Sequence, residues 1–410
     1  MRIAQVSPLW ESVPPRLYGG TERVVSYLTE ELVRQGHEVT LYASGDSQTS
    51  ARLEAACPHA LRLSTGLVNR DAPLILMQEH AMGADADQFD IIHSHLDFLS
   101  FPMSRRCPTP VLTTLHGRLD LPELGPIFRE YADMQLVSIS DAQRLPLPHA
   151  NWQATVYHGL PDLYTFHPNT GSYLAYLGRI CPEKRPDHAI EIAKRVGIPL
   201  RIAAKVDPVD REYFVTKIAP LMDHPLIEYL GEISDAEKGH FLGDAAAVLC
   251  TYDWPEPFGI VLIEALACGT PVFAYRRGSI PEIIEDGVTG FICDSLDEMV
   301  AKIDRLPLIK RQRCRESFQA RFTAERMVKD YLAVYERMAT VPARAHAFAN
   351  GRSLRMVGPR PVAVSELTTA HGTAQAPRKG RVQHGWTRPF HYPSSHSSLA
   401  IVGRLHPSVG

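Results

Sequence analysis

The sequence predicts an α/β protein made of two successive doubly wound halves, each with a parallel sheet. Three observations predict this class. Short β-branched runs alternate with helical patterns, the alternation lapses at residues 162–172, and it then starts again. Short, continuously apolar strands separated by helices are typical of a parallel sheet that is buried on both faces.

The first half begins with a strand and an amphipathic helix. Ile3–Ser7 is the expected strand, and Thr21–Gln35 is the helix, with valines and leucines on one face and Gly36 as its stop. Further strands are expected at Glu38–Tyr42, Asp90–His93, Val111–Leu115 and Leu136–Ile139. The loop over residues 162–172 is the expected hinge between the halves.

The second half repeats the same alternation. Its strands are expected at Tyr173–Leu177, Leu200–Ala204, Ile227–Leu230, Ala247–Cys250, Pro271–Ala274 and Gly290–Cys293. Helices are expected at Pro186–Val196 and Arg211–Met222, and the pattern is helical throughout from Met299 to about Met338.

Composition excludes several classes of protein. The 410 residues are 45% hydrophobic and 22% charged, which is ordinary for a globular chain of two or three domains. No apolar run is long enough to span a membrane, and the first residues show no signal-peptide pattern. The seven cysteines lie at least 18 positions apart, which gives no zinc-ribbon spacing. We therefore expect a cytoplasmic protein in a reducing compartment.

Charge is distributed unevenly along the chain. Residues 341–410 hold nine Lys or Arg and one acidic residue, a net charge of +8, which leaves −11 on residues 1–340 of a chain with −3 overall. The acidic body argues against nucleic acid as a partner. The basic tail has no sustained period, so we expect it to be disordered; the alternative is an arm for an anionic surface.

The densest signal is the segment that begins Glu256-Pro-Phe-Gly-Ile and runs past Glu264 to Gly269. One expected strand precedes it and another follows it. Proline suits the first turn of a helix and glycine its end, so we expect a helix that is entered near Pro257. The free N–H groups of its first turn would form an anion site.

The two glutamates of this segment are eight residues apart, about 12 Å of helix rise. Carboxylates at that spacing suit two hydroxyl-bearing groups that are separated by a diphosphate. The alternative is a capping carboxylate at Glu256 and a helix-face residue at Glu264. Because Glu264 stands among apolar residues, where an unpaired charge is costly, we favour the functional interpretation.

Two further loops follow strands at the same edge of their sheets. Arg179 and Lys184 follow the first strand of the second half, where they could neutralise a diphosphate. Gly19 and Gly20 follow the first strand of the chain and would let a ligand approach the backbone near a helix N-terminus. The alternatives are a solvated charged loop and a simple chain turn.

Four histidines also end strands, namely His93, His95, His116 and His158. Strand carboxyl ends line the crevice of an open α/β sheet, so we expect at least one of them to contact a polar ligand. A metal pair at His93 and His95 is the alternative, but no acidic or cysteine partner has matching spacing.

Motifs of other enzyme classes are absent from the sequence. There is no GxGxxG after the first strand, no GxxxxGK[ST], no HExxH and no GxSxG. One Asp-x-Asp occurs at Asp85–Asp87, in a polar helix end that suggests a solvated surface. We expect neither a metal nor a cofactor.

With these residues assembled, the chain resembles glycosyltransferase family 4, the group 1 set of retaining enzymes. The resemblance rests on Tyr18-Gly-Gly-Thr-Glu, Gly-Arg179…Glu-Lys184-Arg, the Glu256-x7-Glu264 block and Asp286-Gly-Val-Thr-Gly-Phe. It covers residue 1 to about residue 340, and it implies the GT-B architecture of two Rossmann-like domains that face a central cleft.

The resemblance also implies a division of the chain into domains. Residues 1–165 would form the acceptor-side domain and residues 166–320 the nucleotide-sugar domain. Residues 321–340 would form a helix that crosses back to the first domain, and residues 341–410 have no family counterpart.

Site roles follow from the resemblance residue by residue. Glu256 would contact the transferred sugar, and Glu264 the ribose. Arg179 and Lys184 would hold the diphosphate, and His116 would contact the donor sugar.

The remaining expected donor contacts are backbone positions. Gly19 and Gly20 would lie near the phosphate or the acceptor, and the helix N-terminus at Phe258, Gly259 and Ile260 would face the diphosphate. At His158 the chain departs from the family, where many members have Asn; its role is left open.

The expected activity is retaining transfer of a hexose from a nucleotide diphosphate sugar. The acceptor would be a saccharide, a lipid-linked molecule or a small molecule, with peripheral membrane contact left open. The alternatives are a sugar-nucleotide epimerase or sugar phosphorylase on the same scaffold, and a non-catalytic nucleotide or glycan binder.

Overall fold

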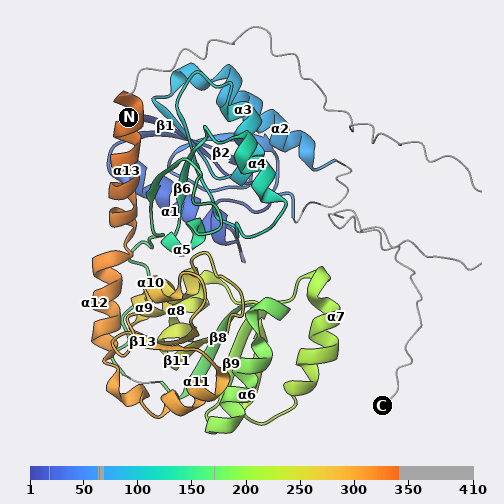
Figure 1. The fold of residues 1–410 in the computed structure, drawn as a ribbon, viewed down its shortest axis with the longest axis vertical. Helices are drawn as coiled ribbons and strands as arrows, with labels where there is room; N and C mark the ends of the chain where they lie inside the picture. Colours follow the sequence, from blue (N-terminus) through green and yellow to red (C-terminus); the bar gives the residue numbers. More distant parts are fainter. Residues whose placement is uncertain (18, 63, 65–68, 170, 341–410) are drawn as a thin grey trace, which may run out of the picture. The chain divides into compact units, whose positions relative to one another are not determined.

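A computed structural model describes residues 1–17, 19–62, 64, 69–169 and 171–340. Its strands form two parallel sheets, one from the first 155 residues and one from residues 173–293 (Figure 1). The predicted fold class, two Rossmann-like halves, is confirmed. The basic tail at 341–410 and Tyr18 of the Gly-Gly loop lie outside the described residues.

The first sheet has seven strands in the order β3-β2-β1-β4-β5-β6-β7. Every neighbouring pair in it is parallel. The strands are β1 (Arg2–Val6), β2 (Glu38–Ser44), β3 (Arg52–Cys57), β4 (Ile91–Ser94), β5 (Val111–Thr114), β6 (Gln135–Ser138) and β7 (Trp152–Thr155). Because the order reverses beside β1, the loops after β1 and β4 diverge at this point, where open α/β sheets bind their ligands.

Helices link these strands. They are α1 (Gly20–Arg34), α2 (Asp71–Glu79), α3 (Phe101–Ser104), α4 (Leu124–Glu130) and α5 (Asp141–Arg144). Val24, Leu28 and Leu32 recur at helical spacing on α1 and are fully buried, which explains why this segment forms a core-facing helix.

The second sheet has six parallel strands in the order β10-β9-β8-β11-β12-β13. They are β8 (Tyr173–Arg179), β9 (Leu200–Lys205), β10 (Ile227–Gly231), β11 (Ala245–Cys250), β12 (Val272–Tyr275) and β13 (Gly290–Cys293). Its helices are α6 (Pro186–Val196), α7 (Arg211–Tyr213), α8 (Asp235–Gly243), α9 (Ile260–Cys268), α10 (Ile280–Ile283), α11 (Leu296–Ile303) and α12 (Arg311–Arg321).

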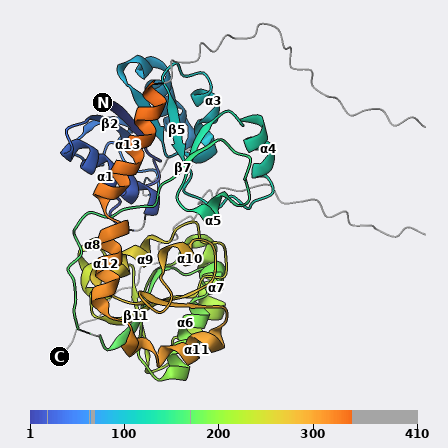
Figure 2. The ribbon, with the colours of Figure 1, turned by 60° about the vertical axis from the view of Figure 1, so that its left-hand side comes forward.

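The last described helix, α13 (Ala324–Thr340), packs against the first sheet rather than the second. It lies beside α1 and β4, and both views show it along the first sheet (Figures 1 and 2). Its buried residues Met327, Val328, Tyr331 and Tyr335 join a hydrophobic cluster with residues of β1, α1, β4 and β5. The first half therefore draws part of its core from the end of the described chain.

The structure corrects several element boundaries. The expected helix over Arg211–Met222 is α7 followed by a π-turn at Phe214–Ile218 and a 3₁₀ turn at Ala219–Leu221. The region from Met299 to about Met338, which the sequence predicts to be helical throughout, is divided among α11, α12 and α13. Strands β3 and β7 lack the β-branched runs by which strands are identified, so the sequence did not predict them. No helix within the described ranges is both long and apolar enough to cross a membrane.

Candidate functional site

The segment after β11 forms the centre of the candidate site. The helix expected near Pro257 begins later, at Ile260, because Gly259 adopts φ 83 and sets a left-handed turn before it. Glu256 therefore lies in a loop, and the estimate of about 12 Å of helix rise does not apply to the two glutamates. Ile260 provides the first helical residue of α9.

Hydrogen bonds from other elements hold this loop. Ser279 donates its backbone N–H to the carbonyl oxygen of Glu256 at 2.9 Å and its hydroxyl to that of Phe258 at 2.8 Å. Ser140, which follows β6 of the first sheet, donates its hydroxyl to the carbonyl oxygen of Pro257 at 2.7 Å. Both sheets thus contribute to the position of one loop.

Glu256 and Lys184, which the sequence predicted separately, form a direct ion pair. Lys184 Nζ lies 2.5 Å from Glu256 Oε2, and Trp254 donates its indole N–H to the same oxygen at 2.8 Å. The ammonium group also lies 3.7 Å from the centre of the Tyr252 ring. The two side chains are about nine-tenths buried, so the pair is little screened by solvent.

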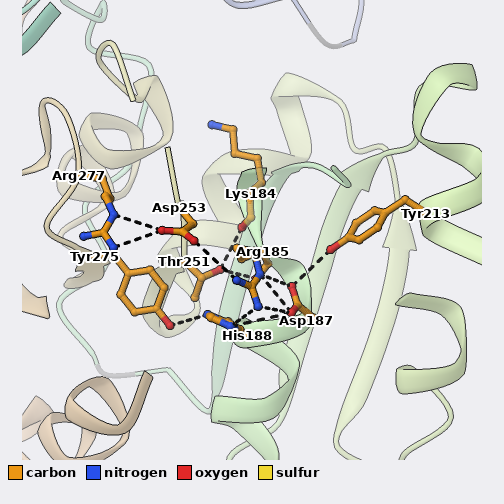
Figure 3. A network of polar contacts seen from close by, with 9 residues as sticks. All are labelled: Lys184, Arg185, Asp187, His188, Tyr213, Thr251, Asp253, Tyr275 and Arg277. Carbon is orange, nitrogen blue, oxygen red and sulfur yellow. Dashed lines mark hydrogen bonds and ion pairs between the residues drawn. The ribbon is translucent and has the colours of Figure 1, made fainter. Parts of the chain in front are cut away.

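The loop that carries Lys184 is fixed through its backbone. Thr251 donates its hydroxyl to the carbonyl oxygens of Lys184 at 3.1 Å and Arg185 at 2.7 Å. Asp253 donates its backbone N–H to the carbonyl oxygen of Glu183 at 2.8 Å. The Lys184 side chain extends away from this network (Figure 3). Its ammonium group binds the carboxylate of Glu256.

Arg185 forms the middle of that network. Its backbone has φ 47, a left-handed conformation that costs a non-glycine residue energy, and it immediately precedes Pro186 and α6. Its guanidinium group binds both carboxylate oxygens of Asp187 and lies 3.7 Å from Asp253 (Figure 3). These charge-assisted bonds hold the turn that presents Lys184.

Arg179 has carboxylates of another loop as neighbours. It ends β8, and its guanidinium group is 3.6 Å from Asp207 and 3.7 Å from Asp210. The structure therefore places this expected diphosphate ligand at the carboxyl end of the central strand β8, next to two carboxylates.

Glu264 has a separate environment on α9. It is 1% exposed, accepts a hydrogen bond from the Tyr164 hydroxyl at 2.8 Å and pairs with Lys238 Nζ at 3.2 Å. Burial raises the pKa of Glu264, but the charges of Lys238 and Arg23 outweigh it and leave the pKa below its ordinary value. The structure thus does not bring the two predicted glutamates into a shared contact network.

The Gly-Gly loop lies against α9. A Cβ atom on Gly20 would meet Ile260 Cδ1 at 3.6 Å, so the start of α1 and the start of α9 are neighbours. Arg23, one turn further along α1, pairs with Asp235 at the start of α8. Two helix N-termini, both able to attract an anion, therefore lie close together.

The four strand-end histidines form one cluster. The rings of His93 and His95 lie 4.0 Å apart, those of His95 and His116 5.2 Å apart, and those of His116 and His158 5.4 Å apart and stacked. His158 meets the Phe258 ring edge-on at 4.7 Å. His116 is therefore linked to the loop before α9 through one intervening ring.

The histidine cluster is electrically neutral. Burial lowers the pKa of His93, His95 and His158 well below the ordinary value, and it lowers that of His116 to about 3. Among the described residues, no group of three or more His, Cys, Asp or Glu side chains is arranged to hold a metal ion. The Asp85 carboxylate instead accepts a hydrogen bond from the Tyr42 hydroxyl at 2.8 Å.

Sequence reasoning did not find several groups that shape the site. Tyr252 and Trp254 surround the Lys184 ammonium, Ser279 holds the Glu256 loop, and Tyr164 and Lys238 bind Glu264. The aromatic residues could have been suspected, because they stand between β11 and the Glu256 segment. The others come from distant parts of the chain, and only the fold brings them together.

Chemically, the arrangement can bind an anion beside a polar, uncharged ring cluster. Lys184, in the loop after β8, and the N-terminus of α9 supply positive charge, while Glu256, in the loop before α9, offers a carboxylate. Both halves of the chain contribute residues around the start of α9. The first half provides Gly20 and His116, and the second half provides Glu256.

Two family models match adjoining parts of the chain. Residues 18–150 match the model described as Glycosyltransferase Family 4, and residues 165–321 match the model described as Glycosyl transferases group 1. Each of the two sheets thus has its own family match.

Curated relatives include named glycosyltransferases. N-acetyl-alpha-D-glucosaminyl L-malate synthase of Bacillus anthracis is 27% identical over 363 residues, which cover 77% of this chain and 93% of the relative. D-inositol 3-phosphate glycosyltransferase of Mycolicibacterium gilvum is 27% identical over 339 residues, which cover 68% and 74%.

Solved structures show the same fold. Sucrose-phosphate synthase from Thermosynechococcus elongatus superposes with a TM-score of 0.68 at 17% identity and covers 82% of this chain and 99% of its own. Anabaena HepE in complex with UDP and glucose gives a TM-score of 0.64 at 17% identity and covers 82% and 100%. Together with the two family matches and the paired Lys184 and Glu256 at the start of α9, these similarities show that the chain belongs to the group 1 glycosyltransferases of family 4, with the GT-B fold, and that it is a glycosyltransferase rather than an epimerase, a phosphorylase or a passive binder.

Proposed function

We propose that the chain transfers a hexose from a nucleoside diphosphate sugar to a hydroxyl group of its acceptor, with retention of anomeric configuration. The observation that carries this proposal is the ion pair of Lys184 and Glu256 at the N-terminus of α9. A diphosphate leaving group needs positive charge, and the transferred sugar gains positive character in the transition state. A cation and a carboxylate that two neighbouring loops bring together serve these two needs.

The proposed site divides the donor among the predicted residues. Lys184, Arg179 and the α9 N-terminus at Phe258, Gly259 and Ile260 bind the diphosphate, and Gly19 and Gly20 let it approach the start of α1. Glu256 and His116 contact the sugar, and Glu264 accepts hydrogen bonds from the ribose. A ribose hydroxyl at Glu264 would join or replace the bond from Tyr164.

Retention in this proposal does not use a covalent sugar intermediate. That route needs two carboxylates that flank the anomeric carbon. Glu256 pairs with Lys184, whereas Glu264 is enclosed by Tyr164 and Lys238, so the two do not share one reacting atom. The acceptor hydroxyl instead attacks the anomeric carbon from the same face from which the leaving group departs. The departing phosphate oxygen takes the proton of that hydroxyl.

The donor and acceptor classes are inferred from the relatives. One solved neighbour was crystallised with UDP-glucose, and the names of two relatives give L-malate and D-inositol 3-phosphate. We infer that the donor is a hexose linked to a pyrimidine or purine nucleoside diphosphate. The acceptor is a small molecule, a glycan or a lipid-linked molecule. A lipid-linked acceptor would bring the protein to a membrane surface by peripheral contact.

We also propose the domain division that the family implies. The acceptor-side domain spans 1–165 and the donor-side domain 166–320, with 321–340 returning to the first domain. The separate sheets and the packing of α13 on α1 support this division.

A titration with nucleotide sugars tests the donor. The full chain is heated with UDP-, GDP- and ADP-linked glucose, mannose and N-acetylglucosamine, and the true donor raises the melting temperature by mass action. Lys184→Ala should abolish this shift, whereas the exposed control Lys329→Ala should retain it. Release of nucleoside diphosphate that depends on an acceptor would support transfer. The proposed donor site would be contradicted if no nucleotide sugar raised the melting temperature, or if Lys184→Ala showed the same rise as the wild type.

A further inference from the structure

A chain of hydrogen bonds runs from His116 into the protein. His116 Nε2 lies 2.9 Å from His95 Nδ1, and His95 Nε2 lies 2.8 Å from Gln5 Oε1. Gln5 in turn donates from Nε2 to the hydroxyl of Tyr335 at 3.2 Å. Gln5 is on β1, whereas Tyr335 is on α13, so the chain joins the first strand of the protein to the last described helix.

The same chain continues past Tyr335. Its hydroxyl lies 2.6 Å from His93 Nδ1, and His93 Nε2 lies 2.7 Å from Thr114 Oγ1, which is 3.0 Å from the hydroxyl of Tyr331. All of these side chains are buried, whereas His116 at the open end is partly exposed. A buried, fully connected network of this kind permits few arrangements of its protons.

The orientation of the Gln5 amide selects one proton order. Its oxygen can only accept, so His95 must carry its proton on Nε2 and leave Nδ1 as an acceptor. His116 must then donate from Nε2 to His95. In the neutral imidazole this leaves Nδ1 of His116 with a lone pair, and no described residue forms a hydrogen bond with that atom.

We propose that Gln5, oriented by Tyr335, acts through His95 as a positioning residue that holds His116 in the Nε2–H tautomer and presents the lone pair of Nδ1 to a hydroxyl group of the transferred sugar. This inference rests on the proposed function, because it takes His116 as a sugar contact. In the hydrogen bond between them, Nδ1 of His116 is always the acceptor and the sugar hydroxyl is always the donor.

Two observations support a neutral, fixed imidazole at His116. Desolvation lowers the pKa of His116 to about 3 and that of His95 well below the ordinary value, so neither carries charge near neutral pH. The His116 ring is also held from its other side, because it stacks on His158, which packs against Phe258. The ring therefore has a fixed plane as well as a fixed proton.

The tautomer can be measured without any substrate. Long-range ¹H–¹⁵N correlation spectra of the full chain, with the His116 signals assigned by their loss in His116→Gln, should show a protonated Nε2 and an unprotonated Nδ1. A Gln5 amide in the reversed orientation would impose the opposite tautomer, with the proton on Nδ1 of His116. Observation of that tautomer, or of a doubly protonated ring, would overturn the inference.

Two tyrosines on α13 provide a matched pair of variants. Tyr335→Phe removes the hydroxyl to which Gln5 Nε2 donates, so His116 should become a mixture of tautomers. Tyr331→Phe removes a hydroxyl of equal burial one turn away, which contacts Thr114 but not Gln5, and it should leave His116 unchanged. Equal spectra for both variants would show that Gln5 does not set the tautomer.

Kinetics then test what the tautomer does. With the nucleotide sugar that turns over in the donor panel, Tyr335→Phe should lower kcat about fivefold, the effect of one hydrogen bond, with a smaller change in donor KM. In a His116→Ala background the same substitution should have no further effect. Multiplicative losses would contradict action through His116. Absence of turnover with every donor would remove the proposed function and the sugar contact, whereas the tautomer measurement would stand.

Discussion

At the scale of single residues, the two glutamates of the family motif differ in what surrounds them. Glu256 shares one oxygen between the Lys184 ammonium and the Trp254 indole, beside the helix that would face the diphosphate. Glu264 is buried further along α9 and has a hydroxyl and a second ammonium as partners. This difference predicts separate kinetic roles.

Loss of the Glu256 carboxylate should affect turnover. Its interaction strengthens as the sugar gains positive charge, so Glu256→Ala should lower kcat roughly 10²–10³-fold, or about 3–4 kcal/mol, with little change in donor KM. Steady-state kinetics after circular dichroism measure this. A kcat near that of the wild type would show that Glu256 does not contact the reacting sugar.

Loss of the Glu264 carboxylate should affect donor binding instead. A ribose contact is made equally in the ground state and the transition state, so Glu264→Ala should weaken donor binding by about 1–3 kcal/mol. Glu264→Gln keeps an accepting oxygen for Tyr164 and serves as the control for folding. If kcat falls while the donor KM stays constant, the assigned role is wrong.

Glu22 gives a pH dependence to stability. Burial raises its pKa from 4.5 to about 7, so the folded protein binds this proton more tightly than the unfolded chain does. The stability is fully present below pH 4.5 and is lost as the pH rises through 7. In Glu22→Gln, the free energy of unfolding relative to wild type should therefore increase by about 3 kcal/mol between pH 4.5 and pH 8.

Denaturant unfolding at several pH values measures this difference. The exposed Glu38→Gln provides the control and should follow the wild type. A constant difference between Glu22→Gln and wild type over this pH range would mean that Glu22 keeps an ordinary pKa in the folded protein.

At the scale of elements, the loop between β8 and α6 depends on a neighbouring strand end. Thr251 follows β11 and fixes two consecutive carbonyl groups, those of Lys184 and Arg185 (Figure 3). Thr251→Val keeps the shape but removes both bonds, so Lys184 should lose its fixed position. We expect kcat/KM for the donor to fall roughly three- to tenfold, the range of one net hydrogen bond.

Thr216→Val is the matched control for this loop, because its hydroxyl donates to the carbonyl oxygen of Glu212 on an exposed turn. It should leave kcat/KM unchanged. If Thr251→Val also retains full activity, the position of Lys184 is set by Glu256 rather than by the loop.

Elements with strong local signals could be predicted from the sequence. Helix α6 has proline at its start and a glycine just past its end, and both observed ends match the prediction. The start of α9 was placed too early, because a proline suits a first helical turn and the left-handed turn at Gly259 has no equally strong local signal. The edge strands β3 and β7 are partly exposed and lack the apolar runs of buried strands.

The candidate site was predictable only where a motif carries it. Lys184 and Glu256 each follow a strand of the same parallel sheet, so topology alone suggested a common edge. The partners of Glu264 and the bonds from His116 to Tyr335 join segments as much as 330 residues apart. Such contacts follow from tertiary packing, which no local pattern encodes.

At the scale of the whole molecule, α13 completes the core of the first sheet. Met327 is fully buried among residues of β1 and α1, and its sulfur accepts the backbone N–H of Gly159 at 3.2 Å. Met327→Ala should therefore lower the free energy of unfolding by about 2–5 kcal/mol, the usual cost of emptying a core position. Urea unfolding measures this, and the exposed Lys329→Ala on the same helix should cost less than about 0.5 kcal/mol.

The placement of α13 also has a consequence for synthesis. A ribosome finishes all seven strands of the first sheet by residue 155, but the cluster that covers one face of it closes only when Met327–Met338 have emerged. Folding of this half therefore cannot be completed in the order of translation, although domains generally fold as units from the N-terminus. The nascent chain therefore lacks the residues that complete this hydrophobic cluster until the second half has been synthesised.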